Sequence, residues 1–406
     1  MRVLFLTHRL PYAPNRGDRI RSYHILQSMR AWADVDLVSL VHDDEEAGHA
    51  AEVERFAATV RTARVRKVPN MLRAALMLAS GRPLTHALLH SPDLRPAVAS
   101  AVRAHRPAVV FAYCTGIAPI ALEEPLRDIP LVLDMVDVDS AKWATLAASS
   151  ALPRSWIYAR EARTLARFER TIARSARTTL VTTEAERETL ARVAPGVAIE
   201  VLENGVDVDA LRPPGPPAES ATIVFCGVMN YPPNVEGAIW LAREVWPIVR
   251  RARPDARLEI VGSSPTRAVR ALADPAAGIV VTGAVPDVRP FLWGAAAAVA
   301  PLRTARGVQN KVLEAVAAGL PVVVTHAVSV GLPAAVNKLC RRVDGAPEWA
   351  GALTGLLELR PASRRALVPR GIVDALRWSV RLGNLEGTMA KAGQSRATPD
   401  TTARPL

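Results

Sequence analysis

The chain has 406 residues, enough for two or three domains at roughly 100–200 residues each, and half of these residues are hydrophobic. Its formal net charge of +12 indicates a polyanionic neighbour, such as nucleic acid, an anionic membrane surface or a phosphorylated substrate. No zinc-finger spacing, basic-zipper pattern or RNP-like aromatic cluster accompanies that charge, so nucleic acid is not expected as a partner.

The cysteines and the apolar runs indicate the cellular compartment of the protein. Cys114, Cys226 and Cys340 lie far apart and form no CxxC pair, which favours a reducing, cytoplasmic compartment. The N-terminal MRVLFLTHRL lacks a small-residue cleavage site, so it is interpreted as a first strand. No apolar run reaches the roughly 20 residues that a membrane-spanning helix needs.

Short apolar runs recur along the chain, separated by segments of helical character. They lie at Arg2–Thr7, Val35–Val41, Ala108–Ala112, Pro130–Val136, Thr178–Thr182 and Ile199–Leu202, and then at Thr222–Cys226, Arg257–Val261, Gly278–Thr282, Ala296–Ala300 and Pro321–Thr325. Buried parallel strands look like this because helices cover both faces of their sheet. The pattern predicts two doubly wound α/β domains with ligands at the carboxyl ends of their strands.

A Pro-rich stretch at 212–218 interrupts the alternation. Paired prolines cannot continue a helix or a central strand, so we place a linker at 209–220, between an N-terminal domain at 1–208 and a C-terminal domain at 221–372. A helix at 373–393 is expected to pack back near the N-terminal domain. The polar tail at 394–406 is expected to be disordered.

The strongest chemical signal is a Gly-containing loop followed by a helix that begins near Val308–Lys311. A helix N-terminus offers unpaired N–H groups and a positive dipole end, which suit a diphosphate. Lys311 adds a positive charge, while Gln309 and Asn310 add neutral donors. Glu314, one turn further in, can accept hydrogen bonds from sugar or ribose hydroxyls. Spacing alone fits an ordinary exposed helix start equally well.

Two other groups of polar residues raise the question of a metal site. Asp137 and Asp139 form a D-x-D, a short pattern that is common by chance, and Asp139 with Ser140 could simply cap a helix. His86 and His90 stand four apart, but no third ligand or HExxH glutamate accompanies them. The sequence predicts no metal at either place.

The segment 61–82, RTARVRKVPNMLRAALMLASGR, combines several cations with apolar residues. Such a segment can lie on an anionic bilayer surface. An amphipathic helix packed on the first domain explains it equally well.

Several stretches together resemble the retaining GT-B-fold glycosyltransferases of group 1, or family 4, and within them the sugar transferases associated with exopolysaccharide and exosortase systems. The segment Gly307–Thr325, GVQNKVLEAVAAGLPVVVT, is similar to that family's donor-binding segment. The other similar stretches are Pro11–Arg21, Glu203–Asp207, Phe225–Asn234 and Thr282–Asp287. The resemblance implies a GT-B fold, with two facing Rossmann-like domains and a cleft between them.

The resemblance also implies roles for individual residues. Glu314 matches the second glutamate of an E-x7-E pair, which holds the donor ribose, while the first glutamate is replaced by Arg306. Gly17 matches a glycine that approaches the donor phosphate, where a side chain would block the contact, although it could also be a simple turn glycine. Asp137 lies where relatives contact the transferred sugar or the acceptor.

Relatives commonly carry an Arg and a Lys in the donor loop that begins here at Gly227, but this loop, GVMNYP, has neither. A leaving diphosphate needs its growing charge stabilised. We therefore expect Arg306 with Lys311, and Arg303 as a further candidate, to supply the missing cations. The alternative is that Arg306 is a solvated loop residue.

The function implied is transfer of a hexosyl unit from a nucleoside-diphosphate sugar to a glycan or polyprenyl-linked acceptor, with retained configuration and without metal or cofactor, in cell-surface polysaccharide biosynthesis. A lipid-linked acceptor would bring the protein to the inner face of the plasma membrane. One alternative is a catalytically impaired nucleotide-sugar or glycan-binding protein. Another is a nucleotide-sugar epimerase using the carboxylates at Asp134–Asp139. A dinucleotide-dependent oxidoreductase is disfavoured because neither first-strand loop offers G-x-G-x-x-G.

Overall fold

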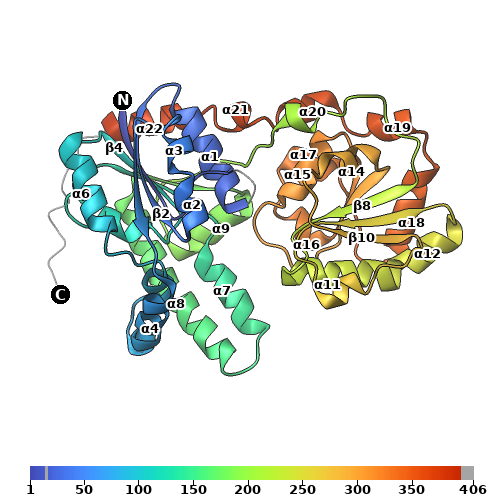
Figure 1. Ribbon diagram of the computed structural model, residues 1–406, viewed down its shortest axis with the longest axis horizontal. Helices are drawn as coiled ribbons and strands as arrows, with labels where there is room; N and C mark the ends of the chain where they lie inside the picture. The colour runs from blue at the N-terminus through green and yellow to red at the C-terminus, as the bar shows by residue number, and fades with distance from the viewer. Residues whose placement is uncertain (14–16, 395–406) are drawn as a thin grey trace. The chain divides into compact units, whose positions relative to one another are not determined.

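The computed structural model describes residues 1–13 and 17–394. The chain divides into two compact units, Met1–Leu202 with the residues from Leu382 onward, and Glu203–Arg381. Each unit is a parallel sheet with helices on both faces (Figure 1). The prediction of two doubly wound α/β domains is therefore confirmed.

The first unit contains a seven-stranded parallel sheet in the order β3-β2-β1-β4-β5-β6-β7. Its strands are β1 (Arg2–Thr7), β2 (Asp34–Val41), β3 (Thr59–Arg64), β4 (Val109–Tyr113), β5 (Leu131–Val136), β6 (Thr178–Val181) and β7 (Ile199–Val201). The central strands β1, β4 and β5 are apolar along almost their whole length and are buried between helices.

The helices of the first unit connect these strands and cover the sheet. They are α1 (Gly17–Met29), α2 (Asp44–Gly48), α3 (Ala50–Val53), α4 (Lys67–Leu76), η1 (Met77–Ala79), α5 (Leu84–Leu88), α6 (Leu94–Ala104), η2 (Ala118–Leu122), α7 (Asp139–Ala148), α8 (Arg154–Ser175), α9 (Glu184–Val193) and α22 (Leu385–Gln394). The last of these, α22, packs against β4 and β5 and so returns the chain to the first sheet.

The second unit contains a six-stranded parallel sheet in the order β10-β9-β8-β11-β12-β13. Its strands are β8 (Thr222–Cys226), β9 (Arg257–Val261), β10 (Ile279–Gly283), β11 (Ala297–Ala300), β12 (Val322–Val324) and β13 (Arg341–Arg342). Its helices are α10 (Val208–Leu211), α11 (Pro232–Trp240), η3 (Leu241–Val245), α12 (Trp246–Ala252), α13 (Arg267–Arg270), α14 (Arg289–Gly294), α15 (Asn310–Ala317), α16 (His326–Ser329), α17 (Ala334–Leu339), α18 (Ala346–Glu358), α19 (Pro361–Ala366), α20 (Arg370–Asp374) and α21 (Trp378–Arg381).

The chain passes from the first unit to the second after Leu202. This point lies several residues before the linker that we placed at 209–220. Contacts with the C-terminal part of the second unit explain this position. Val206 N donates to Leu376 O at 2.8 Å, and Glu203 forms an ion pair with Arg381. A Cβ on Gly205 would lie 2.7 Å from the Trp378 backbone, so only glycine allows this close approach.

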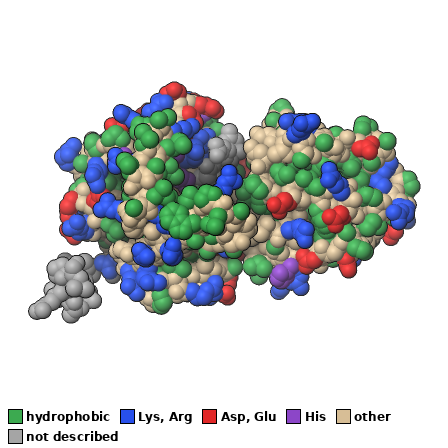
Figure 2. All heavy atoms as spheres, turned by 90° about the horizontal axis from the view of Figure 1, so that it is seen from below, with side chains coloured by type: hydrophobic (Ala, Val, Ile, Leu, Met, Phe, Trp, Pro, Cys, Tyr) green, Lys and Arg blue, Asp and Glu red, His purple; other side chains and the backbone are tan. Residues whose placement is uncertain are grey.

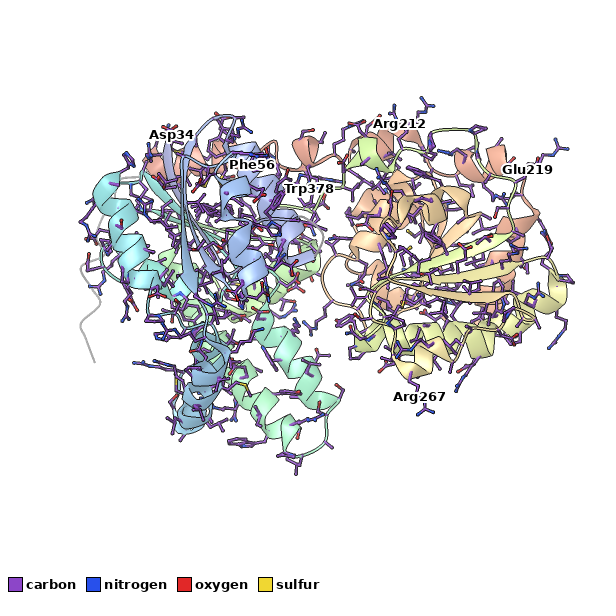
Figure 3. All side chains as sticks on the ribbon, viewed as in Figure 1. Asp34, Phe56, Arg212, Glu219, Arg267 and Trp378 are labelled. Atoms are coloured by element: carbon purple, nitrogen blue, oxygen red, sulfur yellow. The ribbon has the colours of Figure 1, made fainter. Side chains whose placement is uncertain are left out.

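The Pro-rich stretch belongs to the second unit. Arg212, its first residue, and Glu219, which follows it, are exposed on that unit's surface (Figure 3). At the other crossing, α20 and α21 also belong to the second unit, and the return to the first unit begins only at Leu382. The tail expected to be disordered lies, from residue 395 onward, outside the described residues.

The segment 61–82 is not one helix. Its first residues belong to β3, an edge strand that pairs only with β2 among the described strands and is therefore mostly accessible to solvent. Residues 67–76 form α4. None of the helices in the described part of the chain combines the length and apolar character needed to cross a membrane.

Candidate functional site

In the second unit, the loops after β8 and β9 meet backbone to backbone. Gly262 has a φ of +149°, and a Cβ built on it would lie 1.7 Å from the carbonyl oxygen of Gly227. Gly227 N donates to Val261 O at 3.0 Å, and Met229 N donates to Ser263 O at 2.8 Å. Two glycines therefore bring both loops together at the carboxyl end of the sheet, where doubly wound folds bind ligands.

Lys311, in the first turn of α15, extends toward this pair of loops. Its Nζ donates to Asn234 Oδ1 at 2.6 Å and lies 4.9 Å from the ring centroid of Phe225. A Cβ on Gly227 would come within 2.9 Å of that Nζ. Asn234 is buried in α11, and its Nδ2 donates to Val228 O at 2.9 Å. Gly227 thus leaves room for the Lys311 amino group, which contacts Asn234 of α11 and Phe225 of β8.

The charge on Lys311 is only partly compensated. Burial lowers the pKa of Lys311 to about 8, although Cys226 and Glu314 oppose that shift. Burial also raises the pKa of the Glu314 carboxyl, and Lys311 offsets part of this. The hydrogen-bond acceptor of the ammonium is the neutral amide of Asn234. An anionic ligand at this end of the sheet would stabilise the protonated lysine.

The N-terminus of α15 is tied to the segment that begins the second unit. Asn204 Nδ2 donates to Asn310 Oδ1 at 3.1 Å, which connects the family-like stretch Glu203–Asp207 to the helix start. Gln309 is the N-cap residue, but its side chain makes no capping hydrogen bond and instead donates from Nε2 to Arg306 O at 3.1 Å. Gln309 O accepts from Val312 N at 2.9 Å, while the Gln309 side chain leaves the N–H groups of Asn310 and Lys311 uncapped, and these can serve an anion.

The predicted donor residues fall into two groups. The structure brings Lys311 and Gly227 into contact and places Glu314 one turn further along α15. Arg303 and Arg306, in contrast, are exposed on the loop before the helix. Asn234 was not singled out as a site residue from the sequence, although it closes the predicted Phe225–Asn234 motif.

In the first unit, Asp137 follows a strained strand end. Val136 and Cys114, at the ends of the neighbouring strands β5 and β4, have φ values of 67° and 71°, a region that non-glycine residues rarely adopt. Asp137 is half-buried and accepts a hydrogen bond from Thr182 Oγ1 at 3.1 Å. Burial raises the pKa of its carboxyl. Such backbone strain concentrates at functional sites.

The carboxylates around Asp137 have separate structural partners. Asp134 forms a buried ion pair with Arg21 of α1, with Oδ2 and Nε 2.8 Å apart. Asp139 accepts from Thr115 Oγ1 at 2.6 Å and does not cap α7, so the helix-cap interpretation of Asp139 is wrong. Among the residues that the structure describes, no group of three or more His, Cys, Asp or Glu residues is placed to hold a metal ion.

Two further predicted positions have plain structural settings. Gly17 is the first residue of α1, and residues 14–16 of the loop before it lie outside the described residues. His86 packs edge-on against Phe168, with ring centroids 4.3 Å apart, and burial lowers the pKa of its imidazole to about 4. Its neutral ring is thus a packing element on α5.

Comparison with known proteins assigns both units. A family model described as a glycosyl transferase 4-like domain matches residues 17–205, and one described as glycosyl transferases group 1 matches residues 220–358. The second match contains the whole Gly227–Lys311 arrangement. No curated protein sequence matches the chain.

Solved structures similar to this chain share its fold. A sucrose-phosphate synthase from Thermosynechococcus elongatus is 18% identical, with a TM-score of 0.66 and coverage of 97% of this chain and 100% of that one. HepE from Anabaena in complex with UDP and glucose is 14% identical, with a TM-score of 0.65 and coverage of 96% and 100%. HepE in complex with UDP-glucose is 13% identical, with a TM-score of 0.64 and the same coverage.

The fold is therefore GT-B, as the sequence predicted. The two matched domains, one in each unit, make the chain a glycosyltransferase of the GT-B type with a 4-like N-terminal part and a group 1 C-terminal part.

Proposed function

We propose that the protein transfers a hexosyl unit from a nucleoside-diphosphate sugar to a glycan or polyprenyl-linked acceptor. The observation that carries this proposal is the placement of Lys311 and the uncapped start of α15 beside the Gly227 loop within the group 1 domain. A cation and free N–H groups at one strand end suit a diphosphate. The similar HepE structure contains UDP-glucose, which supports a nucleotide sugar as donor.

Each donor residue has a proposed task. Lys311 and the first N–H groups of α15 stabilise the leaving diphosphate, and Glu314 accepts hydrogen bonds from the donor ribose. Gln309 and Asn310 position the phosphates as neutral donors, and Gly227 and Gly17 let backbone approach them. Arg306 adds a second cation from the exposed loop before α15, and Arg303, three positions earlier, is a further candidate.

The proposed reaction retains the anomeric configuration and requires neither metal nor cofactor. The bond between the anomeric carbon and the diphosphate breaks, and the acceptor oxygen bonds to the anomeric carbon from the same face. The acceptor proton passes to the leaving phosphate, so no strong base is demanded of the protein. Asp137 contacts the transferred sugar or the acceptor. We place this reaction in the biosynthesis of exopolysaccharide or another cell-surface polysaccharide, in the cytoplasm.

The test begins with a panel of nucleotide sugars in a thermal-shift assay, because a ligand that binds the folded state raises the melting temperature. The stabilising donor is then supplied in labelled form, with and without a chelator. We expect sugar release or transfer with unchanged rate in the chelator, and an NMR spectrum showing the donor's anomeric configuration in the product. An inverted product or loss of activity with the chelator would refute the corresponding part of the proposal.

The same assay separates the alternatives. A stabilising donor that is recovered intact would indicate a nucleotide-sugar-binding protein, which the absence of cations from the Gly227 loop favours. A donor recovered with an inverted sugar carbon would indicate an epimerase, although each carboxylate at Asp134–Asp139 already has a hydrogen-bonding partner.

A further inference from the structure

Helix α4 exposes its apolar residues to solvent. Val68, Met71, Leu72 and Leu76 are 70%, 66%, 65% and 85% exposed. At about 100° per residue, these four positions form one stripe along the helix. A helix that merely covers the core would bury such a stripe, so the interpretation of this segment as an amphipathic helix with its apolar face packed on the first domain is wrong.

The opposite side of α4 is attached to the first unit through polar contacts. Asn70 is 3% exposed, and its Nδ2 donates to Leu88 O at 2.9 Å and to His90 O at 2.7 Å. Ala74, one turn later, is also buried. Because both residues lie opposite the stripe, this anchorage turns the apolar residues outward.

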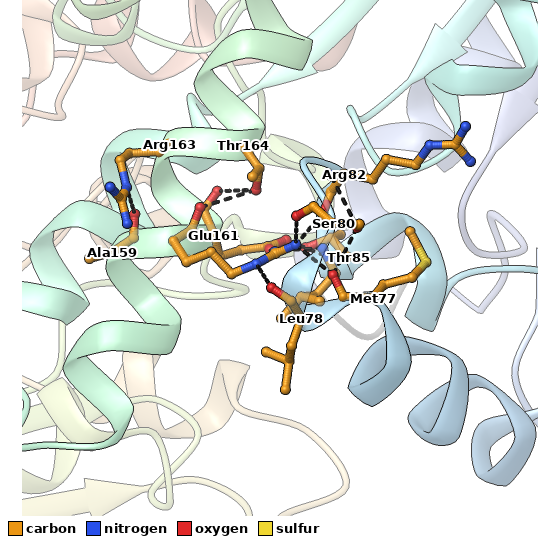
Figure 4. Close-up of polar contacts among 11 residues, drawn as sticks. Met77, Leu78, Ser80, Arg82, Thr85, Ala159, Glu161, Arg163 and Thr164 are labelled. Carbon is orange, nitrogen blue, oxygen red and sulfur yellow. Dashed lines mark hydrogen bonds and ion pairs between the residues drawn. The ribbon is translucent and has the colours of Figure 1, made fainter.

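The chain that follows α4 is held by a buried charged pair on α8 (Figure 4). Arg160 donates to the carbonyl oxygens of Met77, Leu78, Ser80 and Arg82. Its neighbour Glu161 accepts from Leu84 N at 2.7 Å and from Thr85 N at 2.9 Å. With this many hydrogen bonds, the exposed stripe belongs to a fixed element and not to a loose loop.

Basic residues flank this apolar stripe. Lys67 and Arg73 are exposed and fall on opposite flanks of the stripe, and Arg66 precedes the helix. From Arg55 to Pro92 the sequence contains seven Lys or Arg residues and no Asp or Glu. Figure 2 shows apolar and basic side chains adjoining one another on the underside of the first unit.

We propose that α4 docks this protein on an anionic phospholipid bilayer. The apolar stripe enters the boundary between headgroups and acyl chains, and the flanking cations contact lipid phosphates. Four aliphatic side chains on ten residues offer little area for a protein interface, which buries about 800 Å² per partner. A bilayer, in contrast, matches both the apolar stripe and the cations that flank it. This surface lies in the first unit and does not depend on the donor chemistry of the second.

The test is co-sedimentation of the full chain with vesicles of phosphatidylcholine, with and without phosphatidylglycerol. We expect binding only to the anionic vesicles, weakened by salt. The variant Leu72→Gln with Leu76→Gln should lower the partition coefficient about tenfold or more. The variant Lys67→Gln with Arg73→Gln should lower it about fivefold for each cation removed.

The matched control replaces two exposed apolar residues of the second unit, Leu367→Gln with Val380→Gln, and should bind as the wild type does. Circular dichroism checks that each variant is folded. Equal sedimentation of the wild type and both α4 variants would overturn the proposal. The proposal would also be overturned if the wild type formed a dimer in the absence of vesicles and the Leu72→Gln with Leu76→Gln variant did not. Donor hydrolysis in solution should be unchanged in the α4 variants, so failure here is distinct from failure of the proposed function.

Discussion

Lys311 is held inside the candidate site before any ligand binds, and the other two candidate cations are exposed. Its ammonium is held by Asn234 and lies over Phe225, whereas Arg303 and Arg306 are exposed on a loop. A pre-organised charge stabilises a transition state without reorganising as the reaction proceeds. We therefore assign Lys311 the principal part in stabilising the leaving diphosphate and Arg306 a smaller one.

The first prediction is that Lys311→Met lowers kcat by about 10²–10³, the usual cost of losing one pre-organised donor. Arg306→Ala should lower it by a smaller factor, and Lys338→Met, at an exposed lysine of the same unit, should leave it unchanged. The pKa of Lys311 is about 8. The wild-type kcat/KM should therefore fall as the pH rises through about 8, because the free enzyme loses its cation. A larger effect of Arg306→Ala than of Lys311→Met would reverse the assignment.

The second prediction concerns Glu314. Glu314→Gln should weaken donor binding about 10–100-fold, the equivalent of about 1.5–3 kcal/mol for a hydrogen bond to a charged group. Folding should persist, because the amide has nearly the same shape as the carboxylate and carries no charge to desolvate on burial. Calorimetric titration with the donor measures the change, and Glu236→Gln, at an exposed position of α11, is the control. Unchanged affinity in Glu314→Gln would exclude contact with the ribose.

Among the elements, the contact between the β8 and β9 loops shapes the proposed donor site. The predicted strands Thr222–Cys226 and Arg257–Val261 agree with β8 and β9 at both ends. Strand β8 is apolar after its first residue, and in β9 the apolar residues Leu258, Ile260 and Val261 are the buried ones. The contact of Gly262 with Gly227 is tertiary and has no signal in a single sequence. The same holds for the hydrogen bond between Lys311 and Asn234, which lie 77 positions apart.

The elements that the sequence did not predict are those with little apolar character. Strand β3 reads TVRTAR and β13 has two arginines, so neither shows the apolar run by which the other strands were recognised. For α4 the composition indicated an amphipathic helix, but the direction of its apolar face depends on the Asn70 contacts with a segment some 20 residues away. The periodicity of a sequence shows that a helix has an apolar face, but it does not show which residues cover that face.

The third prediction tests the loop contact. Gly262→Ala should destabilise the second unit by about 2–4 kcal/mol, because a methyl group cannot occupy a position 1.7 Å from a carbonyl oxygen and the backbone must move. Gly351→Ala, within α18 and with no atom within 4 Å of the new methyl, should instead stabilise it by up to about 1 kcal/mol. Urea denaturation measures both. A Gly262→Ala variant as stable as the wild type would show that the two loops do not pack this closely.

At the scale of the whole molecule, the described hydrophobic clusters stay within single units. One packs against the sheet of the first unit and another against that of the second, and the two share no residue. The chain crosses between the units after Leu202 and again after Arg381. A change in the stability of one core should therefore be measurable separately from the other.

The fourth prediction uses a buried carboxyl of the first unit. Glu169 on α8 is fully buried and accepts hydrogen bonds from Ser140 N, at 2.9 Å, and from Ser140 Oγ, and burial raises its pKa from 4.5 to about 7. Between these values the folded state keeps a proton that the unfolded state has lost. The free energy of unfolding of the first unit should therefore fall as the pH rises through this window, by up to about 3 kcal/mol.

Glu169→Gln should remove this dependence, because the amide cannot ionise and its carbonyl oxygen can still accept from Ser140. At pH 8 the first unit of the variant should be up to about 3 kcal/mol more stable than that of the wild type, and near pH 4 the two should be equal. Hydrogen exchange of β4 and β5 in the first unit, and of β8 and β11 in the second, would follow the two cores in one sample. Only the exchange of β4 and β5, in the first unit, should differ between the wild type and the variant. An unchanged pH dependence in Glu169→Gln would show that the Glu169 carboxyl is ionised in the folded protein at neutral pH.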